Sequence, residues 1–221
     1  MKVPDKPPKQ RTEVRQASLV EAALLLAAQR SPTSITTGDL ASAVGITQGA
    51  VFRHFDSKEA IWLAVLDWVT EALMAHLQAA ADAANLIGVD PMQVPQPLSA
   101  LRAVFVAHVD FVVAHPGVPR VIFQELQSPG DTALKFRVRG LMQRYRQLLL
   151  NLLQQAQMEQ GLQADIDLNA AAVLFIGSVQ GLVMQALISG DVPAMARQAP
   201  AVFAIYQRGL LARTPDSQGT P

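Results

Sequence analysis

The stretch from Thr36 to Lys58, TTGDLASAVGITQGAVFRHFDSK, limits the possible folds more than any other part of the chain. Thr36 and Asp39 stand three residues apart, the spacing of a capping box that opens a helix. Gly45 follows a short apolar pattern at the point where a helix can end in the left-handed conformation that glycine adopts easily. The pattern therefore predicts two short helices joined by a tight turn, with the second helix over residues 48–55.

The second of these helices carries a compact set of polar groups on the side that its apolar residues Val51 and Phe55 leave free. Hydroxyl, amide and guanidinium groups bind DNA phosphates and base edges, and a glycine permits close approach. Lys58 adds a cation where the next helix begins, beside amides that can bind an anion. The free side of this helix is formed by Thr47, Gln48, Gly49, Phe52, Arg53 and His54.

The whole segment resembles the DNA-binding helix-turn-helix of the TetR family of transcriptional regulators. The resemblance lies in the runs ITTGDLASAVGIT, QGAVFRHF and DSKEAI, and it covers about residues 11–69. Many members have Tyr where Phe52 stands, so a hydroxyl that would reach phosphate is absent here. The resemblance implies contacts from Thr37, Thr47, His54 and Lys58 to the DNA backbone, and places Gln48, Gly49 and Arg53 near bases. With Thr36 and Phe52, these residues form the candidate DNA-binding set.

Length favours a small domain joined to a larger one, and composition is compatible with a reducing compartment. The chain has 221 residues, 50% of them hydrophobic, and no cysteine. This length suits two unequal domains, and the absence of cysteine excludes disulfides. Residues 1–58 hold eight Lys or Arg and five acidic residues, whereas the remainder holds ten and thirteen. A basic front and an acidic rear suit a protein that presents one end to a polyanion.

The remaining pattern is helical throughout, without strand-like alternation or an internal repeat. We expect an all-α fold of about nine helices in which a three-helix DNA-binding domain precedes a larger helical domain for ligand binding and dimerisation. Pro and Gly clusters punctuate the helices, and residues 85–97 are expected to form a loop. The expected regions are a disordered arm at 1–10, the helix-turn-helix domain at 11–56, the effector-binding and dimerisation domain at 57–213, and a disordered tail at 214–221. The arm lacks the apolar stretch of a signal peptide, which argues against export.

The segment Leu168–Ile188 carries no charge and is long enough to cross a bilayer. Polar residues within it, acidic flanks and the absence of a basic or aromatic girdle argue against a membrane span. A helix that is apolar on all sides in a soluble protein must be covered on all sides. We therefore expect it to pair with its copy in a second subunit, together with the last helix, as the family resemblance also implies. The candidate dimer residues are Phe175, Gly177, Gly181, Met184 and Phe203.

The larger domain offers candidates for an effector site but none for catalysis. The sequence lacks metal-ligand, hydrolase and phosphate-loop spacings, so we expect no enzymatic activity, metal or cofactor. His108 and Glu125 each interrupt an apolar helix face, as a pocket for an apolar or aromatic effector would require. A core histidine hydrogen-bonded to a core glutamate would give the same pattern. The candidate pocket residues are Trp62, Phe105, His108, Phe111, Val112, Ile122, Glu125 and Met142.

The sequence thus predicts a cytoplasmic, homodimeric repressor that binds a palindromic operator on double-stranded DNA and releases it when a small effector binds. Two other classes of protein could have the same sequence pattern. A helical adaptor could bind protein through the face assigned to DNA, and failure to bind duplex DNA at low salt would identify it. A helical enzyme with a vestigial motif would show turnover, although no group of residues in the sequence indicates which reaction it would catalyse.

Overall fold

The computed structural model describes residues 12–87, 98–159 and 161–211. The arm expected at 1–10, the tail expected at 214–221 and most of the loop expected at 85–97 lie outside these residues. The described residues confirm an all-α fold, and their only β-type pairing is an isolated bridge between Leu162 and Leu211. The elements in chain order are α1 Thr12–Gln29, the 3-10 helix η1 Pro32–Ser34, α2 Thr37–Ala43, α3 Gln48–Val51, α4 Lys58–Ile87, α5 Ser99–Ala114, α6 Gly117–Gln127, α7 Ala133–Met158, α8 Leu168–Ser189 and α9 Ala194–Leu210.

Several helix ends follow directly from local sequence chemistry. Gly45 and Gly190 have φ angles of 67° and 74°, the left-handed conformation expected after a helix. The side chain of Asp167 accepts hydrogen bonds from the first amides of α8, at 2.8 Å from Asn169 N. The second helix of the motif is shorter than the expected 48–55. It ends at Val51, and Arg53 N and His54 N then bond three residues back, so the chain continues as tight turns.

The contacts of the chain divide it into two compact units. Unit 1 comprises the described residues up to 69 together with 115–138, so it contains α1, η1, α2, α3, α6 and the first turns of α4 and α7. Unit 2 comprises 70–114 and the described residues from 139 onward, with α5, α8, α9 and the rest of α4 and α7. This division into two units is based on which residues pack together. The boundary expected at residue 57 instead separates the DNA-binding domain from the effector-binding and dimerisation domain, and it stays a prediction.

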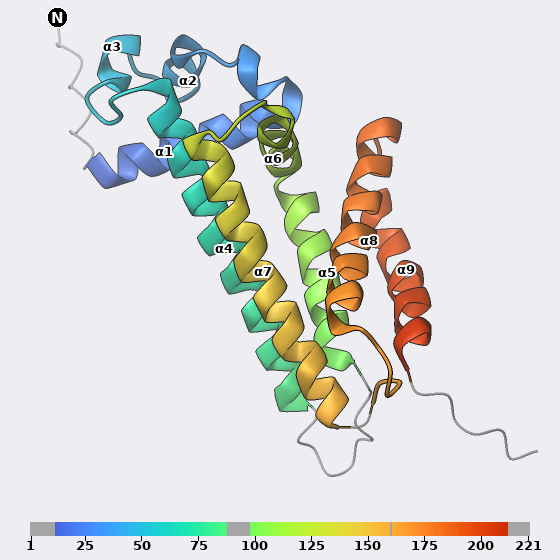
Figure 1. The fold of residues 1–221 in the computed structure, drawn as a ribbon. Helices are drawn as coiled ribbons and strands as arrows, with labels where there is room; N and C mark the ends of the chain where they lie inside the picture. Colours follow the sequence, from blue (N-terminus) through green and yellow to red (C-terminus); the bar gives the residue numbers. More distant parts are fainter. Residues whose placement is uncertain (1–11, 88–97, 160, 212–221) are drawn as a thin grey trace, which may run out of the picture. The chain divides into compact units, whose positions relative to one another are not determined.

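Within unit 1, α6 packs against α1 (Figure 1). The contact is closest at Gly117, the first residue of α6, where an added Cβ would overlap the carbonyl oxygen of Leu24 and stand 3.0 Å from Ala28 N. The side chains of Leu19, Ala23 and Ala27 are fully buried along α1. The α1–α6 pair is therefore held at backbone-to-backbone distance.

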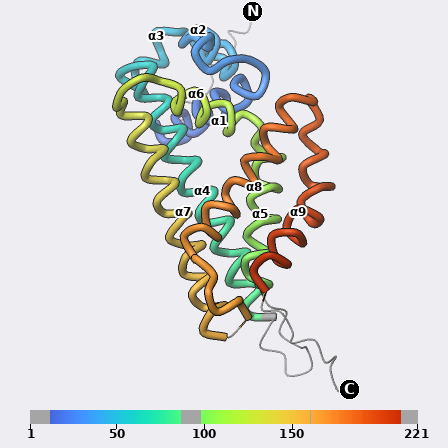
Figure 2. The backbone as a smooth tube through the Cα atoms, turned by 45° about the vertical axis from the view of Figure 1, so that its right-hand side comes forward, coloured from blue at the N-terminus to red at the C-terminus, as the bar shows by residue number. Residues whose placement is uncertain are grey.

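Within unit 2, helices α5, α8 and α9 pack side by side around an aromatic core (Figure 2). Phe105 lies edge-on to Phe175 with ring centroids 5.2 Å apart, and Phe203 lies 5.5 Å from Phe105. The hydroxyl of Tyr206 donates to Ala171 O at 3.1 Å. Edge-to-face aromatic pairs stabilise a core beyond simple burial. The assignment of Phe175 and Phe203 to the dimer surface is therefore wrong, because both rings are buried inside their own chain, with 0% and 1% exposure.

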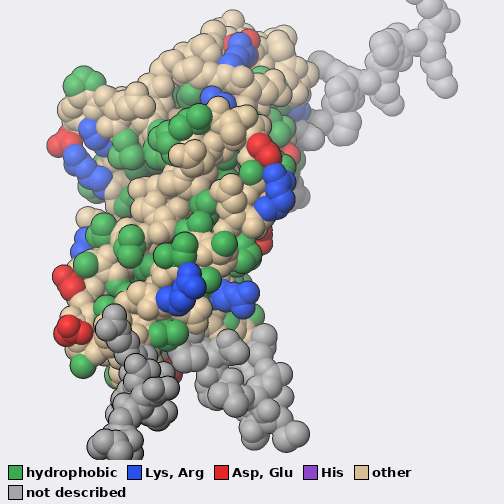
Figure 3. All heavy atoms as spheres, turned by 90° about the vertical axis from the view of Figure 1, so that its right-hand side faces the viewer, with side chains coloured by type: hydrophobic (Ala, Val, Ile, Leu, Met, Phe, Trp, Pro, Cys, Tyr) green, Lys and Arg blue, Asp and Glu red, His purple; other side chains and the backbone are tan. Residues whose placement is uncertain are grey.

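The opposite side of α8 is apolar and exposed. Val173, Leu174, Met184 and Ile188 are between 45% and 72% exposed, and Ile205 on α9 is 65% exposed. Figure 3 looks from the side of Figure 1 on which α8 and α9 lie, and hydrophobic side chains spread across the middle of that face. By length and composition alone, α4 and α8 could each cross a membrane, as could the bent pair α5 and α6 if counted as one span.

Candidate nucleic-acid interface and effector site

The start of α2 is fixed by a complete capping box. Thr36 Oγ1 accepts from Asp39 N at 3.1 Å, and Thr36 N donates to Asp39 Oδ2 at 2.7 Å. Arg30, just after α1, forms an ion pair with Asp39 Oδ1 at 2.9 Å. The Arg30 guanidinium, followed by the Thr36 amide, holds the pKa of Asp39 well below its usual range. The Asp39 carboxylate is therefore engaged in hydrogen bonds and an ion pair that stabilise the start of α2.

Helix α3 is joined to α2 by side-chain hydrogen bonds. Thr47 Oγ1 accepts from Ala50 N at 3.3 Å and so caps α3. Gln48 Nε2 donates to Thr37 Oγ1 at 2.8 Å, and Thr37 is only 9% exposed. Gln48 itself is exposed. Thr37 therefore orients the Gln48 amide.

Side chains of α1 hold the far ends of the motif. Arg15 Nη1 donates to Val44 O at 3.3 Å, at the end of α2. Gln16 Nε2 donates to His54 O at 2.8 Å, just after α3. Both carbonyls lie where a helix leaves its last acceptors unpaired. Sequence reasoning missed these supports, since a polar residue on α1 gives no sign of which carbonyl it will meet.

The candidate DNA-binding residues differ in accessibility. His54 is half-buried, and its Nδ1 is buried with no hydrogen-bond partner among the described residues. Lys58 is half-buried, and its Nζ donates to Thr33 O at 3.2 Å. Thr37 is buried. The exposed members are Thr36, Thr47, Gln48, Gly49, Phe52 and Arg53, with Phe52 exposed by 49%. These six form one polar surface with a single large ring, and their contacts to DNA stay a prediction.

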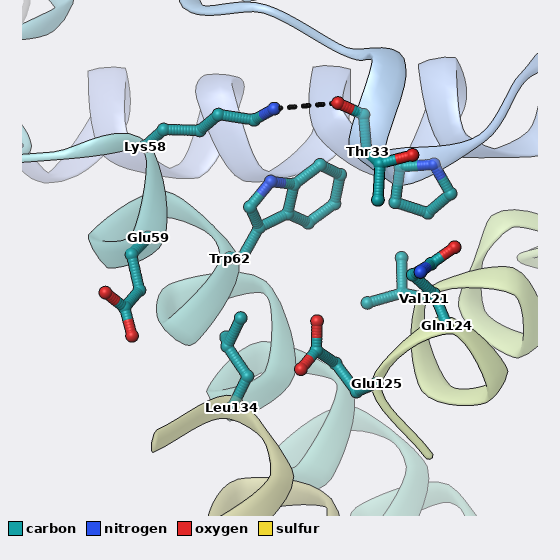
Figure 4. Close-up of a pocket in the computed structure, with 9 residues that line it drawn as sticks. Thr33, Lys58, Glu59, Trp62, Val121, Gln124, Glu125 and Leu134 are labelled. Atoms are coloured by element: carbon teal, nitrogen blue, oxygen red, sulfur yellow. Dashed lines mark hydrogen bonds between the residues drawn. The ribbon is translucent and has the colours of Figure 1, made fainter. Parts of the chain in front are cut away.

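Two candidate effector residues, Trp62 and Glu125, line one cavity of about 240 Å³ in unit 1 (Figure 4). It lies among η1, the first turns of α4, α6 and the start of α7. Its walls are Pro32, Thr33, Lys58, Glu59, Trp62, Val121, Gln124, Glu125 and Leu134. Glu125 Oε2 accepts from Thr132 Oγ1 at 3.3 Å.

The other candidate effector residues do not line this cavity. Phe105, His108, Phe111, Val112 and Met142 belong to unit 2, whereas Ile122 belongs to unit 1 without lining the cavity. His108 Nδ1 is 2.9 Å from Tyr145 Oη, and Tyr145 is fully buried. The core partner of His108 is thus a tyrosine, whereas Glu125 bonds to Thr132. Among the described residues, no cluster of His, Asp and Glu is arranged to hold a metal ion.

Comparisons with known proteins match both parts of the chain. Residues 19–65 match the family described as bacterial regulatory proteins, tetR family, and residues 127–202 match the tetracyclin repressor-like C-terminal domain. The nucleoid occlusion factor SlmA of Vibrio cholerae is 25% identical over 167 residues, which are 76% of this chain and 80% of that protein.

Solved structures share the fold at lower identity. The ketosteroid transcriptional regulator KstR2 of Mycobacterium tuberculosis has a TM-score of 0.70 at 20% identity, covering 90% of this chain and 96% of that one. FadR from Bacillus subtilis, in complex with stearoyl-CoA, has a TM-score of 0.72 at 13% identity, covering 87% and 98%. Both structures therefore share the fold of this chain over nearly all of their length.

Proposed function

Since the chain belongs to the TetR family of bacterial regulatory proteins, we propose that this DNA-binding regulator is a cytoplasmic, ligand-responsive repressor that acts as a homodimer on a palindromic operator. The observation that carries the proposal is the exposed surface of α3 and the turn after it, where Gln48, Gly49, Phe52 and Arg53 are all exposed and Gln48 is held by Thr37 of α2.

The proposed DNA contacts divide into two kinds. Thr36, Thr47 and Lys58 would bind phosphates, because hydroxyls, helix-start amides and an ammonium suit anionic oxygens. Gln48 and Arg53 would read base edges in the major groove, and Gly49 lets the helix approach closely. Thr37 contributes by orienting Gln48, with its hydroxyl 2.8 Å from Gln48 Nε2. The Lys58 ammonium has three donors, so it can bind a phosphate while it still donates to Thr33 O.

Dimerisation is supported by the apolar outer side of α8 and α9. Large exposed apolar patches on soluble proteins mark interaction surfaces. Gly177 and Gly181 lie on this side, and a Cβ at either would meet nothing within 4 Å in its own chain. The two glycines would let a second α8 pack closely. Two-fold pairing would place one motif in each half-site, with the two recognition helices separated by about 34 Å or a multiple.

Release of DNA would follow from a change in that separation. Helix α4 begins beside the motif at Lys58 and continues into unit 2. An effector that favours one position of α4 would alter the spacing of the two motifs. The family neighbour FadR, solved with stearoyl-CoA, supports an effector for this chain as well, of apolar or aromatic character.

The test of the DNA-binding proposal is a salt titration with two variants. We expect Lys58→Ala to weaken binding to every duplex and to lower the slope of log K against log salt by about 0.9, one phosphate contact. We expect Gln48→Ala to change the order of preference among duplexes instead. Gel-shift titrations on duplexes selected from a random library measure both effects.

Arg102→Ala, which removes an exposed cation on α5, is the matched control and should change neither quantity. Equal losses on all duplexes for Lys58→Ala and Gln48→Ala would contradict the division into phosphate and base contacts. A wild-type chain that binds no duplex even at low salt would refute the proposed function and favour the adaptor.

A further inference from the structure

The cavity in unit 1 combines an indole ring, apolar walls and carboxylates. From this combination we propose that it binds a small aromatic cation, a one-ring compound with a quaternary or protonated amine. The proposal names the effector class for the regulator described above and rests on that function only for its effect on DNA.

The size of the cavity selects a small ligand. Its volume of about 240 Å³ lies below the range of roughly 300–1,000 Å³ that is usual for drug-sized compounds. Pro32, Val121 and Leu134 supply apolar parts of the wall. A single ring with a compact charged group suits this space, whereas a long acyl chain would have to extend outside it.

The Trp62 side chain favours a cation over a neutral ring. Its indole lies in the centre of the lining residues in Figure 4, and the residue is 7% exposed. A cation close to the face of a tryptophan is attracted by the negative face of the ring, and partial exclusion of water strengthens that attraction. The Trp62 ring would therefore offer a bound cation both apolar contact and electrostatic attraction.

Glu125 supplies an acceptor that the protein leaves largely unused. Its carboxylate points toward Trp62 in Figure 4. Among the described residues it has one donor, Thr132 Oγ1 at 3.3 Å, and no ion-pair partner. Glu59, exposed on the first turn of α4, adds a second carboxylate to the lining. A carboxylate has room for several donors, so a protonated amine would complete the coordination of Glu125, whereas a quaternary amine would be attracted by its charge alone.

The one cation in the lining is held by another group. Lys58 extends toward η1 and donates to Thr33 O at 3.2 Å (Figure 4). Its ammonium therefore does not neutralise Glu125 by an ion pair. Two acidic residues against one engaged lysine leave the lining with an excess of negative charge, which disfavours an anionic ligand.

The same lysine connects the cavity to the DNA-binding motif. Thr33 precedes α2 in η1, and Lys58 begins α4 after α3, so the Lys58–Thr33 hydrogen bond joins the two ends of the motif. A bound cation would repel the Lys58 ammonium. We expect that repulsion to weaken the Lys58–Thr33 bond and to loosen the placement of α2, so that DNA affinity falls.

The binding step is tested by calorimetric titration of the full-length protein with benzyltrimethylammonium, and with phenylacetate as the anionic counterpart. We expect the cation to bind and the anion not to bind. Glu125→Gln keeps the size of the side chain and removes its charge, so it should weaken cation binding at least tenfold. Glu21→Gln, at an exposed carboxylate on α1, should bind the cation as the wild type does.

Three results would overturn the site: no cation binding by the wild type, unchanged binding by Glu125→Gln, or equal binding of phenylacetate. Circular dichroism confirms that each variant is folded. In a Trp68→Phe background, quenching of the remaining Trp62 fluorescence by the cation, absent in Glu125→Gln, gives a second readout at the cavity.

The effect on DNA is tested separately with duplexes selected by the wild-type protein. Benzyltrimethylammonium should weaken duplex binding by the wild type and by Glu21→Gln, and it should leave Glu125→Gln unaffected. Cation binding without weaker DNA binding would refute the link through Lys58. A protein that binds the cation but no duplex would refute the proposed function and leave the cavity assignment standing.

Discussion

At the scale of single residues, His108 shows how the tertiary structure supplies a partner that the sequence does not reveal. Its place on an apolar helix face fits an effector contact or a core hydrogen bond. The structure gives it a core partner, the hydroxyl of Tyr145 at 2.9 Å, with the rings packed edge to face at 5.1 Å. Burial lowers the pKa of His108 from 6.5 to about 4, because a charged imidazolium is poorly solvated there.

This shift predicts a loss of stability on mild acidification. Unfolded His108 binds a proton near pH 6.5, whereas the folded protein binds it only near pH 4, so unfolding takes up a proton between these values. The free energy of unfolding should therefore fall as the pH drops from 6.5 to 4, by about 2–3 kcal/mol from this residue. Above pH 6.5 the contribution is complete.

Urea unfolding of the wild type and of His108→Gln at pH 7, 5.5 and 4.5 measures the effect. Gln cannot titrate but can still bond to Tyr145, so the variant should lose less stability over this range than the wild type. Parallel losses in both proteins would show that His108 does not titrate differently in the folded state.

At the scale of helices, Gly117 decides how closely α1 and α6 pack. In the sequence, Pro116, Gly117 and Pro119 together have the composition of a helix break. The structure starts α6 at Gly117 and presses that residue onto the backbone of α1. The local pattern indicates a break correctly, but it carries no information about a neighbour almost a hundred residues earlier in the chain.

We expect Gly117→Ala to destabilise unit 1 by about 1–3 kcal/mol, the usual cost of overpacking, because its Cβ would meet backbone atoms that cannot turn away. Thermal and urea unfolding followed by circular dichroism measure the change. Gly140→Ala on α7 is the control: an added Cβ there meets nothing within 4 Å, so the variant should be as stable as the wild type or more so by up to about 1 kcal/mol. Equal stability of Gly117→Ala and the wild type would mean that the two helices can separate freely.

At the scale of the whole molecule, the two sides of α8 support the proposed dimer. The prediction that it is covered on all sides is met only in part within one chain. Phe175 and Val179 are fully buried, whereas Val173 and Leu174 are more than half exposed. The buried side belongs to the aromatic core of unit 2, and the exposed side is left for the proposed dimer.

We expect Gly177→Leu and Gly181→Leu to weaken dimerisation at least tenfold while leaving each subunit folded. Neither new side chain would meet atoms of its own chain at the Cβ position, so any loss must come from contact with the partner. Sedimentation velocity over a concentration series measures the dissociation constant. Gly140→Leu serves as the control of equal size, and unchanged association of the α8 variants would place the dimer contact elsewhere.

The sequence by itself determined the features that depend on neighbours along the chain. The capping box at Thr36, the turn at Gly45 and the cap at Asp167 all depend on groups within a few residues, so their geometry follows from spacing. The helical class, the helix-turn-helix and the family resemblance follow from the same local patterns.

Only the tertiary structure decided which distant groups meet. It placed Phe175 and Phe203 in a core and Gly177 on a surface, although all three lie on apolar helices. It paired His108 with Tyr145, Arg15 with Val44 O and Lys58 with Thr33 O. Such pairings are set by the packing of helices far apart in sequence, which depends on all their side chains together. Local pattern fixes where a helix begins and ends, and packing fixes which of its sides are available for binding.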